Sequence, residues 1–188
     1  RLHAVLEEHG ATMKRVRLVA IFIFLLALAG TVVMFNASKP RLLILHSYDK
    51  EYSWTRDVDV GIRRGLQGKR EFSLRWFYMD TKRHPWQEYK INSGKAAQKL
   101  VRSWQPTVVI AVDDDAQEYA MQHFANRPQV AIVFAGVNGE PASFGYDKAE
   151  NVTGILERKP FAALKETLLQ IAGQRPLRIL FLGDVSES

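Results

Sequence analysis

The feature that most constrains this chain is an uncharged apolar run from Leu18 to Phe35. Its length falls within the roughly 17–25 residues that a membrane-spanning helix needs. The basic segment Lys14-Arg15-Val16-Arg17 immediately precedes it, and basic flanks stay on the cytoplasmic side of a membrane. The sequence therefore predicts a cytoplasmic amino terminus and an exported position for everything that follows the run.

Two interpretations of this run are open, an uncleaved anchor and a secretory signal. A signal peptide has a shorter apolar core and a small-x-small cleavage site. Ala27-Leu28-Ala29 supplies such a site, but the apolar run continues past it to Phe35. This continuation favours an anchor. We therefore expect a signal or transmembrane segment over residues 13–37, with residues 1–12 either unstructured or derived from upstream read-through.

The chain is basic, with a formal charge of +6 and a pI near 9.6. Nucleic-acid binding by a basic chain is recognised by clustered Lys and Arg residues or by a binding motif. Here four of the 26 basic residues lie in the first 17 positions, and the others are interspersed with acidic residues. We therefore expect no nucleic-acid partner. The absence of cysteine excludes disulfides, thiolate zinc sites and cysteine nucleophiles.

Beyond a short polar linker, apolar segments with strand character alternate with segments of helical periodicity. The expected strands are 42–46, 72–79, 107–112, 130–134, 151–156 and 177–182, and the expected helices are 55–66, 85–105, 116–124 and 160–172. Connections of this length suit parallel crossovers. The sequence therefore predicts an α/β fold with a doubly wound, Rossmann-like parallel sheet.

The last expected helix and strand suggest a second unit. In the helix, Phe161, Leu164, Leu168 and Ile171 are expected to point inward. The strand that follows begins a new βα unit without a helix after it. We therefore expect a first lobe over residues 41–156. Residues 157–188 would then hold a crossover helix and the first strand of a truncated second lobe.

Ligands of open α/β sheets bind beyond the carboxyl ends of the strands. Polar and aromatic residues occupy the segments at and after five of the expected strands. The candidate ligand-binding residues are His46, Ser47, Tyr48, Trp54, Asp80, Asp113, Asp114, Gly136, Asn138, Thr153 and Glu157. No glycine-rich phosphate loop follows a strand, which argues against nucleotide binding, and no cofactor is expected.

The run Asp113-Asp114-Asp115 has more than one interpretation. Adjacent carboxylates are candidate ligands for Mg²⁺ or Ca²⁺, and Asp80, Glu157 and Asp184 are the available partners. Acidic residues at a helix start also act as caps, and Asp115 is placed to cap the helix that follows. We favour capping, with polar contact to a ligand as the next interpretation, and expect no metal.

The first loop holds a histidine, a serine and three aromatic residues. No triad arrangement surrounds His46, and Ser47 lacks the Gly-x-Ser-x-Gly context of a nucleophile elbow, so no catalytic residue is expected. We interpret the histidine as a group hydrogen-bonded at a strand end. Tyr48, Tyr52 and Trp54 either stack on a ring-bearing ligand or form a lid packed on the sheet edge.

Five blocks of residues follow one another in register between about Arg41 and Asp184. They are Leu45-His46-Ser47-Tyr48 with Trp54-Thr55, Tyr78-Met79-Asp80-Thr81-Lys82-Arg83, Val112-Asp113-Asp114-Asp115-Ala116, Phe134-Ala135-Gly136-Val137-Asn138 and Val152-Thr153-Gly154-Ile155-Leu156-Glu157. Together they resemble the ABC-transporter substrate-binding-protein-like family, which has the type I periplasmic binding fold. The similarity is closest to members that are extracytoplasmic sensor regions of histidine kinases or diguanylate cyclases.

The resemblance implies a non-enzymatic solute receptor in which two lobes close on a small molecule. Some transporter members of this family take aromatic amino acids, so a small organic solute is the implied ligand. An ABC permease or a fused cytoplasmic output domain is the implied partner, and the inner membrane, with most of the chain in the periplasm, is the implied location. The chain departs from the family pattern by ending before the second lobe.

Two other functions are carried as alternatives. One is an α/β enzyme, either a metal-assisted hydrolase or a flavodoxin-like protein, that uses the cluster Asp113–Asp115. The other is a purely structural domain tethered to the membrane.

Overall fold

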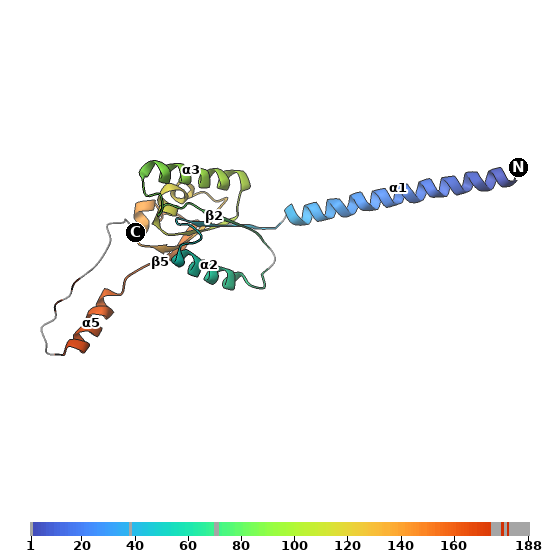
Figure 1. Ribbon diagram of the computed structural model, residues 1–188. Coiled ribbons are helices and arrows are strands. Elements are labelled where there is room, and N and C mark those ends of the chain that lie inside the picture. Colours follow the sequence, from blue (N-terminus) through green and yellow to red (C-terminus); the bar gives the residue numbers. More distant parts are fainter. Residues whose placement is uncertain (1, 38, 70–71, 174–177, 179, 181–188) are drawn as a thin grey trace. The chain divides into compact units, whose positions relative to one another are not determined.

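The structure is a computed structural model that describes residues 2–37, 39–69, 72–173, 178 and 180 (Figure 1). The chain divides into two units, Arg1–Lys39 and Pro40–Ser188, which are described separately.

The first unit is one helix, α1 (Leu2–Ala37). Its segment Met13–Phe35 is long and apolar enough to cross a membrane, and none of it is buried within the protein. The Thr31 hydroxyl donates to the Ala27 carbonyl at 2.8 Å, so this polar group is satisfied inside the helix. The helix fits either a membrane span or a signal sequence. It begins at Leu2, whereas the sequence left residues 1–12 without expected structure.

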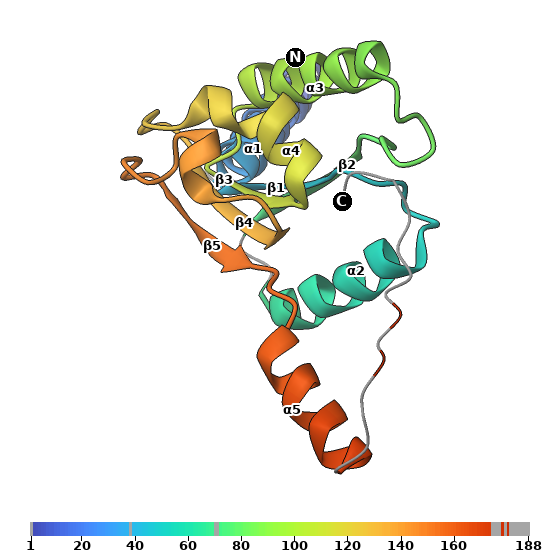
Figure 2. The same ribbon diagram turned by 90° about the vertical axis from the view of Figure 1, so that its left-hand side faces the viewer.

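The second unit is an α/β domain with a five-stranded, all-parallel sheet in the order β2-β1-β3-β4-β5 (Figure 2). The strands are β1 (Arg41–His46), β2 (Ser73–Tyr78), β3 (Val108–Val112), β4 (Ala131–Val137) and β5 (Val152–Leu156). All five occur where the sequence predicts them. The sixth expected strand, 177–182, lies largely outside the described residues, as does Asp184.

The helices of this unit follow the predicted alternation with one interruption. They are α2 (Ser53–Leu66), α3 (Gln87–Trp104), α4 (Asp114–Tyr119) and α5 (Phe161–Ala172), with 3₁₀ turns at Met121–Phe124 (η1) and Pro141–Phe144 (η2). The helix predicted at 116–124 is broken at Ala120, whose φ and ψ of −128° and −63° are not helical. Gly173 ends α5 with φ +59°, and its N–H donates to the Leu169 carbonyl, as a helix-ending glycine does.

The main core lies between the sheet and the helices α3 and α4. Alternate strand residues such as Leu43, Leu45 and Val109 are fully buried there, because successive side chains of a strand point to opposite faces. Ala97 of α3 and Met121 of η1 pack against them. This packing fixes the sheet, and with it the loops that leave the carboxyl ends of its strands.

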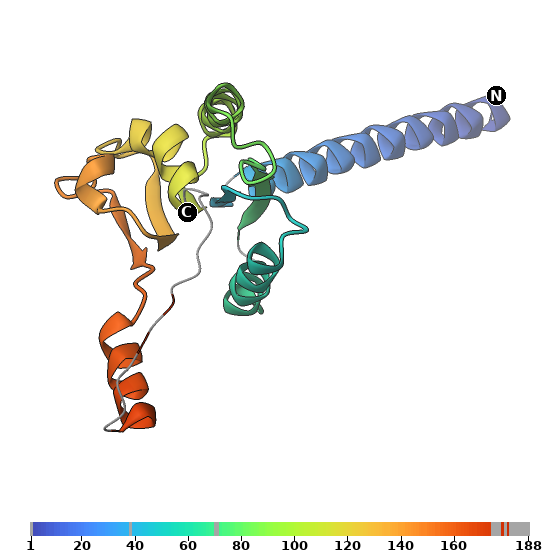
Figure 3. The same ribbon diagram turned by 60° about the vertical axis from the view of Figure 1, so that its left-hand side comes forward.

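Helix α2 covers the opposite face of the sheet (Figures 2 and 3). It contacts the β1–β2 half, where Asp59 meets His46 and Arg63 lies over the Trp76 ring. At the β5 end of this face Ile155 is 74 % exposed. The sheet is therefore covered unevenly on the α2 side.

Helix α5 has no buried residue. Its side chains Phe161, Leu164 and Ile171, which the sequence expected to point inward, are exposed. The expectation was wrong for the residues that the structure describes, because no described element packs against the apolar face of α5.

Candidate functional site

The strand order reverses direction between β1 and β3, and ligands of open parallel sheets bind beside such a reversal. Ser47 joins the loops that leave these two strands. Its hydroxyl donates to the Val112 carbonyl at 3.0 Å and accepts the Ala116 N–H at 2.8 Å. Both hydrogen bonds are buried, so Ser47 holds the two loops together and its oxygen is not offered to a ligand.

Three aromatic side chains gather above this joint. The Tyr48 ring is buried and lies edge-on to Tyr52 and Trp54, with centroid separations of 5.4 and 6.0 Å. The Lys82 ammonium lies 5.2 Å from the Tyr48 ring centroid and 5.6 Å from that of Tyr52. These distances are typical of cation–π contacts. The loops after β1 and β2 therefore meet through an aromatic cluster capped by a cation.

A hollow of about 140 Å³ opens beside this cluster. It is lined by Tyr48, Tyr52, Trp54, Lys82, Asp113, Asn138, Glu157 and Lys159. Five of these were predicted as ligand-binding residues, namely Tyr48, Trp54, Asp113, Asn138 and Glu157. Tyr52 and Lys82 lie in loops that the sequence had selected, whereas Lys159 follows β5 without a motif that marks it.

A second hollow, of about 500 Å³, continues along the same edge and shares Tyr48 and Asp113 with the first. Asp114, Asp115 and Glu118 also line it, so this part of the edge is acidic. The carboxyl edge therefore offers an aromatic and cationic half and an acidic half, which meet at Tyr48 and Asp113.

Asp113 has the most perturbed carboxyl group of the site. Burial raises its pKa to about 6, and a hydrogen bond from the Tyr48 hydroxyl opposes that shift. Burial, and then the nearby Asp113 carboxylate, raise the pKa of Tyr48, so the phenol stays protonated and donates. Asp113 also has a φ of +73° and caps α4 by accepting the Asp114 N–H. The predicted cap was Asp115, but α4 begins at Asp114, two residues earlier than that requires.

The other two carboxylates of the acidic run have different partners. Asp114 accepts the N–H groups of Asn138 and Gly139 at 2.9 and 2.8 Å, and so ties the loop after β4 to the start of α4. Asp115 pairs with the Lys90 ammonium at 3.1 Å. Within the described part of the chain, no group of three or more His, Cys, Asp or Glu side chains is placed to hold a metal ion.

Gly136 makes room for an aromatic side chain of the site. Its φ is +64°, and a Cβ at this position would lie 2.8 Å from the Trp54 ring. The pairing of β4 with β5 shifts register here, between Ala135 and Val137. Gly136 therefore shapes the site by admitting Trp54.

The next loop residue, Asn138, is held from both sides of its backbone. Asp114 accepts its N–H, and Arg158 donates to its carbonyl at 2.8 Å. This leaves the side chain to line the hollow.

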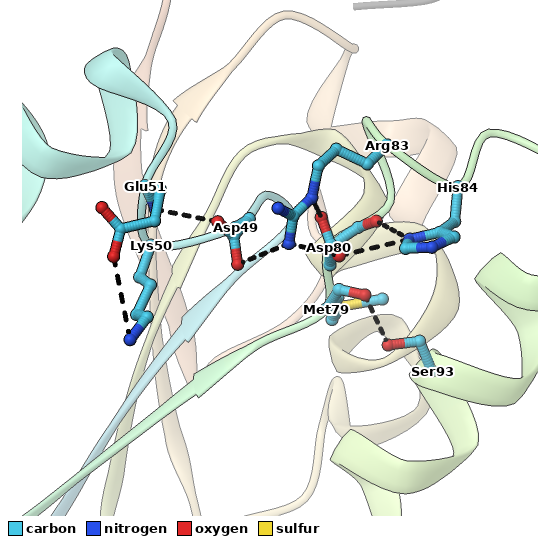
Figure 4. Close-up of polar contacts among 8 residues, drawn as sticks. All are labelled: Asp49, Lys50, Glu51, Met79, Asp80, Arg83, His84 and Ser93. Carbon is cyan, nitrogen blue, oxygen red and sulfur yellow. Dashed lines mark hydrogen bonds and ion pairs between the residues drawn. The ribbon is translucent and has the colours of Figure 1, made fainter.

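Asp80 braces the neighbouring loops (Figure 4). Its carboxylate accepts two hydrogen bonds of 2.8 Å from the Arg83 guanidinium, which also reaches Asp49 at 2.9 Å. His84 adds a contact of 3.2 Å to the same carboxylate. Asp80 has a φ of +59° and links the loops after β1 and β2, but it does not line the hollow.

Two other predicted residues lie away from the hollow. His46 points to the face covered by α2, where its Nε2 lies 2.7 Å from Asp59 Oδ1 and its ring stacks on Tyr78. Burial lowers the pKa of His46, and the Asp59 carboxylate opposes that change. Thr153 lies early in β5, opposite Val133, and is exposed. The structure does not bring either residue to the candidate site.

A further hollow, of about 540 Å³, lies at the opposite edge of the sheet, beside the residues that precede β3 and β4. We take the carboxyl edge as the candidate site because the strand order reverses there and because aromatic, cationic and buried acidic groups line it.

Comparison with protein-family models, curated proteins and solved structures found no match. The site is therefore interpreted from its own geometry.

Proposed function

We propose that this chain is an extracytoplasmic solute-binding receptor domain that recognises a small molecule at the carboxyl edge of its sheet. The observation that carries the proposal is the convergence of Tyr48, Trp54, Lys82, Asp113 and Asn138 on one hollow beside the reversal in strand order. Aromatic faces with a few convergent polar groups are the usual composition of a small-molecule site.

The arrangement of helices supports a doubly wound, Rossmann-like lobe. Helix α2 lies on one face of the parallel sheet and α3 on the other (Figures 2 and 3). The loops that line the hollow come from the same sequence blocks that resemble the type I periplasmic binding family. We therefore propose that residues 41–156 are the first lobe of such a protein, and that residues 157–188 lead into the second.

The size of the hollow supports a cleft with two walls. Typical ligand sites have volumes of roughly 300–1,000 Å³ and enclose most of the ligand. The hollow beside Tyr48 measures about 140 Å³, which is smaller than such a site. We interpret its lining as one of the two walls of the complete site. Closure of a second lobe over the solute would supply the other wall and shift an open–closed equilibrium, because the closed form binds the solute better. An ABC permease or a cytoplasmic output domain would read that closure.

The location follows from α1. We propose that α1 spans the inner membrane and that the sheet domain lies in the periplasm. The basic flank before Leu18 supports this orientation. The apolar run beyond Ala29 supports an uncleaved anchor over a cleaved signal.

The enzyme alternative is less well supported by the geometry. Asp113, Asp114 and Asp115 all line the acidic hollow, but their carboxylates already contact Tyr48, two backbone amides and Lys90 respectively. A turnover assay with Mg²⁺ and activated ester or phosphoester substrates separates the two functions. Turnover that is lost in Asp113→Asn and in Asp114→Asn would favour the enzyme.

The receptor proposal is tested by thermal unfolding of the full chain in the presence of a panel of small organic solutes that includes L-tryptophan, L-tyrosine and L-phenylalanine. We expect at least one solute to raise the unfolding temperature. Asn138→Ala should reduce that shift, because a lost polar contact in a buried site costs on the order of 1–3 kcal/mol. Asn92→Ala, an exposed position on α3, is the matched control and should retain it. An equal loss in both variants would contradict the assignment.

A further inference from the structure

A hollow of about 540 Å³ lies at the amino ends of β3 and β4, away from the proposed solute site. Pro106, two residues before β3, and Val130, directly before β4, form part of its wall. Arg102, Arg127 and His123 also line it. Since the amino and carboxyl ends of parallel strands lie at opposite edges of a sheet, this hollow is separate from the site beside Tyr48.

The loop that forms one wall of this hollow is fixed by a single asparagine. Asn151 Nδ2 donates to the carbonyls of Phe124, Arg127 and Val130 at 3.0, 3.0 and 2.8 Å. Its Oδ1 accepts the Asn126 N–H at 2.7 Å. The backbone that carries Arg127 is therefore held in place, so its side chain is presented from a rigid support.

The charge of the lining is positive. Among the described residues, two arginines and a histidine line the hollow and no carboxylate does. Arg102 stands over the Phe124 ring, with its guanidinium carbon 5.4 Å from the ring centroid. A guanidinium offers several donors in a planar fork and binds phosphate groups well. The lining therefore suits a phosphate-bearing anion.

The chain enters the sheet domain from α1 next to this hollow. Arg41, the first residue of β1, accepts the Thr107 N–H through its carbonyl and donates to the Trp104 carbonyl at 2.7 Å. These contacts lie next to Gln105 and Pro106, which line the hollow. From Ala37, the last residue of α1, an extended chain reaches Arg41 over about 14 Å, at roughly 3.3–3.6 Å per residue.

That distance is about twice the thickness of one polar layer of a bilayer. The polar layers extend a bilayer from about 30 Å of hydrocarbon to about 40–45 Å in total. Where α1 spans a membrane, a linker of this length allows the amino edge of the sheet to contact phospholipid headgroups.

We propose that the hollow lined by Arg102 and Arg127 binds the phosphate of an anionic phospholipid headgroup, which docks the amino edge of the sheet on the bilayer. This inference depends on the membrane-spanning role proposed for α1, and it is independent of solute binding.

The test places the full chain in nanodiscs of phosphatidylcholine, alone or mixed with phosphatidylglycerol. The chain has no cysteine, so Ser103→Cys introduces a single thiol on exposed α3 beside the hollow. A fluorophore on this thiol reports approach to an acceptor lipid by energy transfer. We expect transfer to be higher in discs that contain phosphatidylglycerol. Each basic residue near an anionic surface favours binding about fivefold, so Arg102→Gln with Arg127→Gln should lower the ratio of docked to undocked domain about 25-fold.

The control variant removes two exposed basic residues from the carboxyl edge, Lys50→Gln with Arg56→Gln. It loses the same charge and should keep the energy transfer. Equal transfer in both kinds of disc, or an equal loss in the two double variants, would overturn the proposal. So would an emission change produced by inorganic phosphate in phosphatidylcholine discs that matches the effect of phosphatidylglycerol, because the hollow would then be a free-anion site.

The assay contains no solute, so its result does not depend on solute binding. Nanodiscs expose both leaflets, so the result does not depend on the side of the cell membrane that the domain occupies. Failure of the receptor proposal and failure of headgroup binding are therefore distinguishable.

Discussion

Asp113 combines a strained backbone conformation with φ +73° and ψ 170°, a buried carboxyl group and a tyrosine partner. The first of these is rare outside glycine. The second is costly for an ionised group. Their combination at the end of a central strand makes Asp113 a stronger candidate for a functional residue than its membership of an acidic run does.

The stability of the domain should depend on pH through Asp113. Burial raises its pKa from the model-peptide value of 3.8 to about 6, so between these values the folded state binds more protons than the unfolded state. Stability then falls as pH rises through this window and is constant above it. The free energy of unfolding lost across the whole window is on the order of 1–3 kcal/mol. Asp113→Asn, which keeps the shape of the side chain and cannot ionise, should lack this component.

Denaturant unfolding of the wild type and of Asp113→Asn at a series of pH values across this window measures the effect as the difference between the two curves. Contributions of other groups, such as His46, cancel in that difference. The exposed Asp147→Asn is the control and should run parallel to the wild type. A difference between Asp113→Asn and the wild type that does not change with pH would contradict the assignment.

Gly136 should be intolerant of any side chain for two separate reasons. Its positive φ costs an alanine about 1–2 kcal/mol, and the added Cβ would also collide with Trp54. Gly145 has a φ of +71° and open space around it, so Gly145→Ala isolates the backbone cost. We expect Gly136→Ala to be the more destabilising and to move the indole N–H resonance of Trp54. If the two variants lose the same unfolding free energy and the Trp54 resonance does not move in Gly136→Ala, the close approach of Trp54 to Gly136 does not matter.

The sequence located much of the site but not the role of each side chain. Tyr48, Trp54 and Asn138 were predicted from their position after strands, and they line the hollow. Asp80 and Asp114 were predicted for the same reason, yet they brace loops through Arg83 and backbone amides. Side-chain direction depends on tertiary partners that come from distant segments, and strand position alone does not reveal it.

At the scale of elements, β2 is less covered than its sequence pattern indicates. Residues 72–79 are apolar on both sides apart from Ser73 and Arg75, which is typical of a strand covered on both faces. In the structure β2 is an edge strand with Leu74 and Arg75 exposed, because strand order places it outside β1. The apolar pattern of a strand indicates how many of its faces are apolar. The position of the strand in the sheet depends on how it packs against, and is connected to, other segments, and the sequence of one strand does not specify this.

Helix α5 shows the same limit. Its apolar periodicity predicts a buried face, while Ile171 is 78 % exposed and the helix has no buried residue. Ile171→Ala should therefore change the free energy of unfolding of the domain by less than about 0.5 kcal/mol. Leu45→Ala, at a fully buried position of β1, should cost about 2–5 kcal/mol. Urea unfolding compares the two, and similar costs would mean that the face of α5 is packed in solution.

For the whole molecule, the proposed anchor predicts both topology and extraction behaviour. Ser103→Cys should react with a membrane-impermeant maleimide in cells whose outer membrane alone is permeable. Thr12→Cys, before the apolar run, should react only after lysis. The chain should also stay in the membrane fraction at alkaline pH. Release at alkaline pH would favour a cleaved signal, and labelling of Thr12→Cys without lysis would contradict the orientation.

We propose, as the main conclusion, that solute binds at the carboxyl edge between the loops after β1, β2, β3 and β4. Hydrogen–deuterium exchange of the full chain, with and without the solute that stabilises it most, tests this directly. We predict slower exchange in residues 47–54, 80–84, 113–115 and 136–139, and unchanged exchange in residues 123–130 at the opposite edge. Slower exchange confined to 123–130, or unchanged exchange in all four carboxyl-edge segments while the solute is bound, would contradict the account.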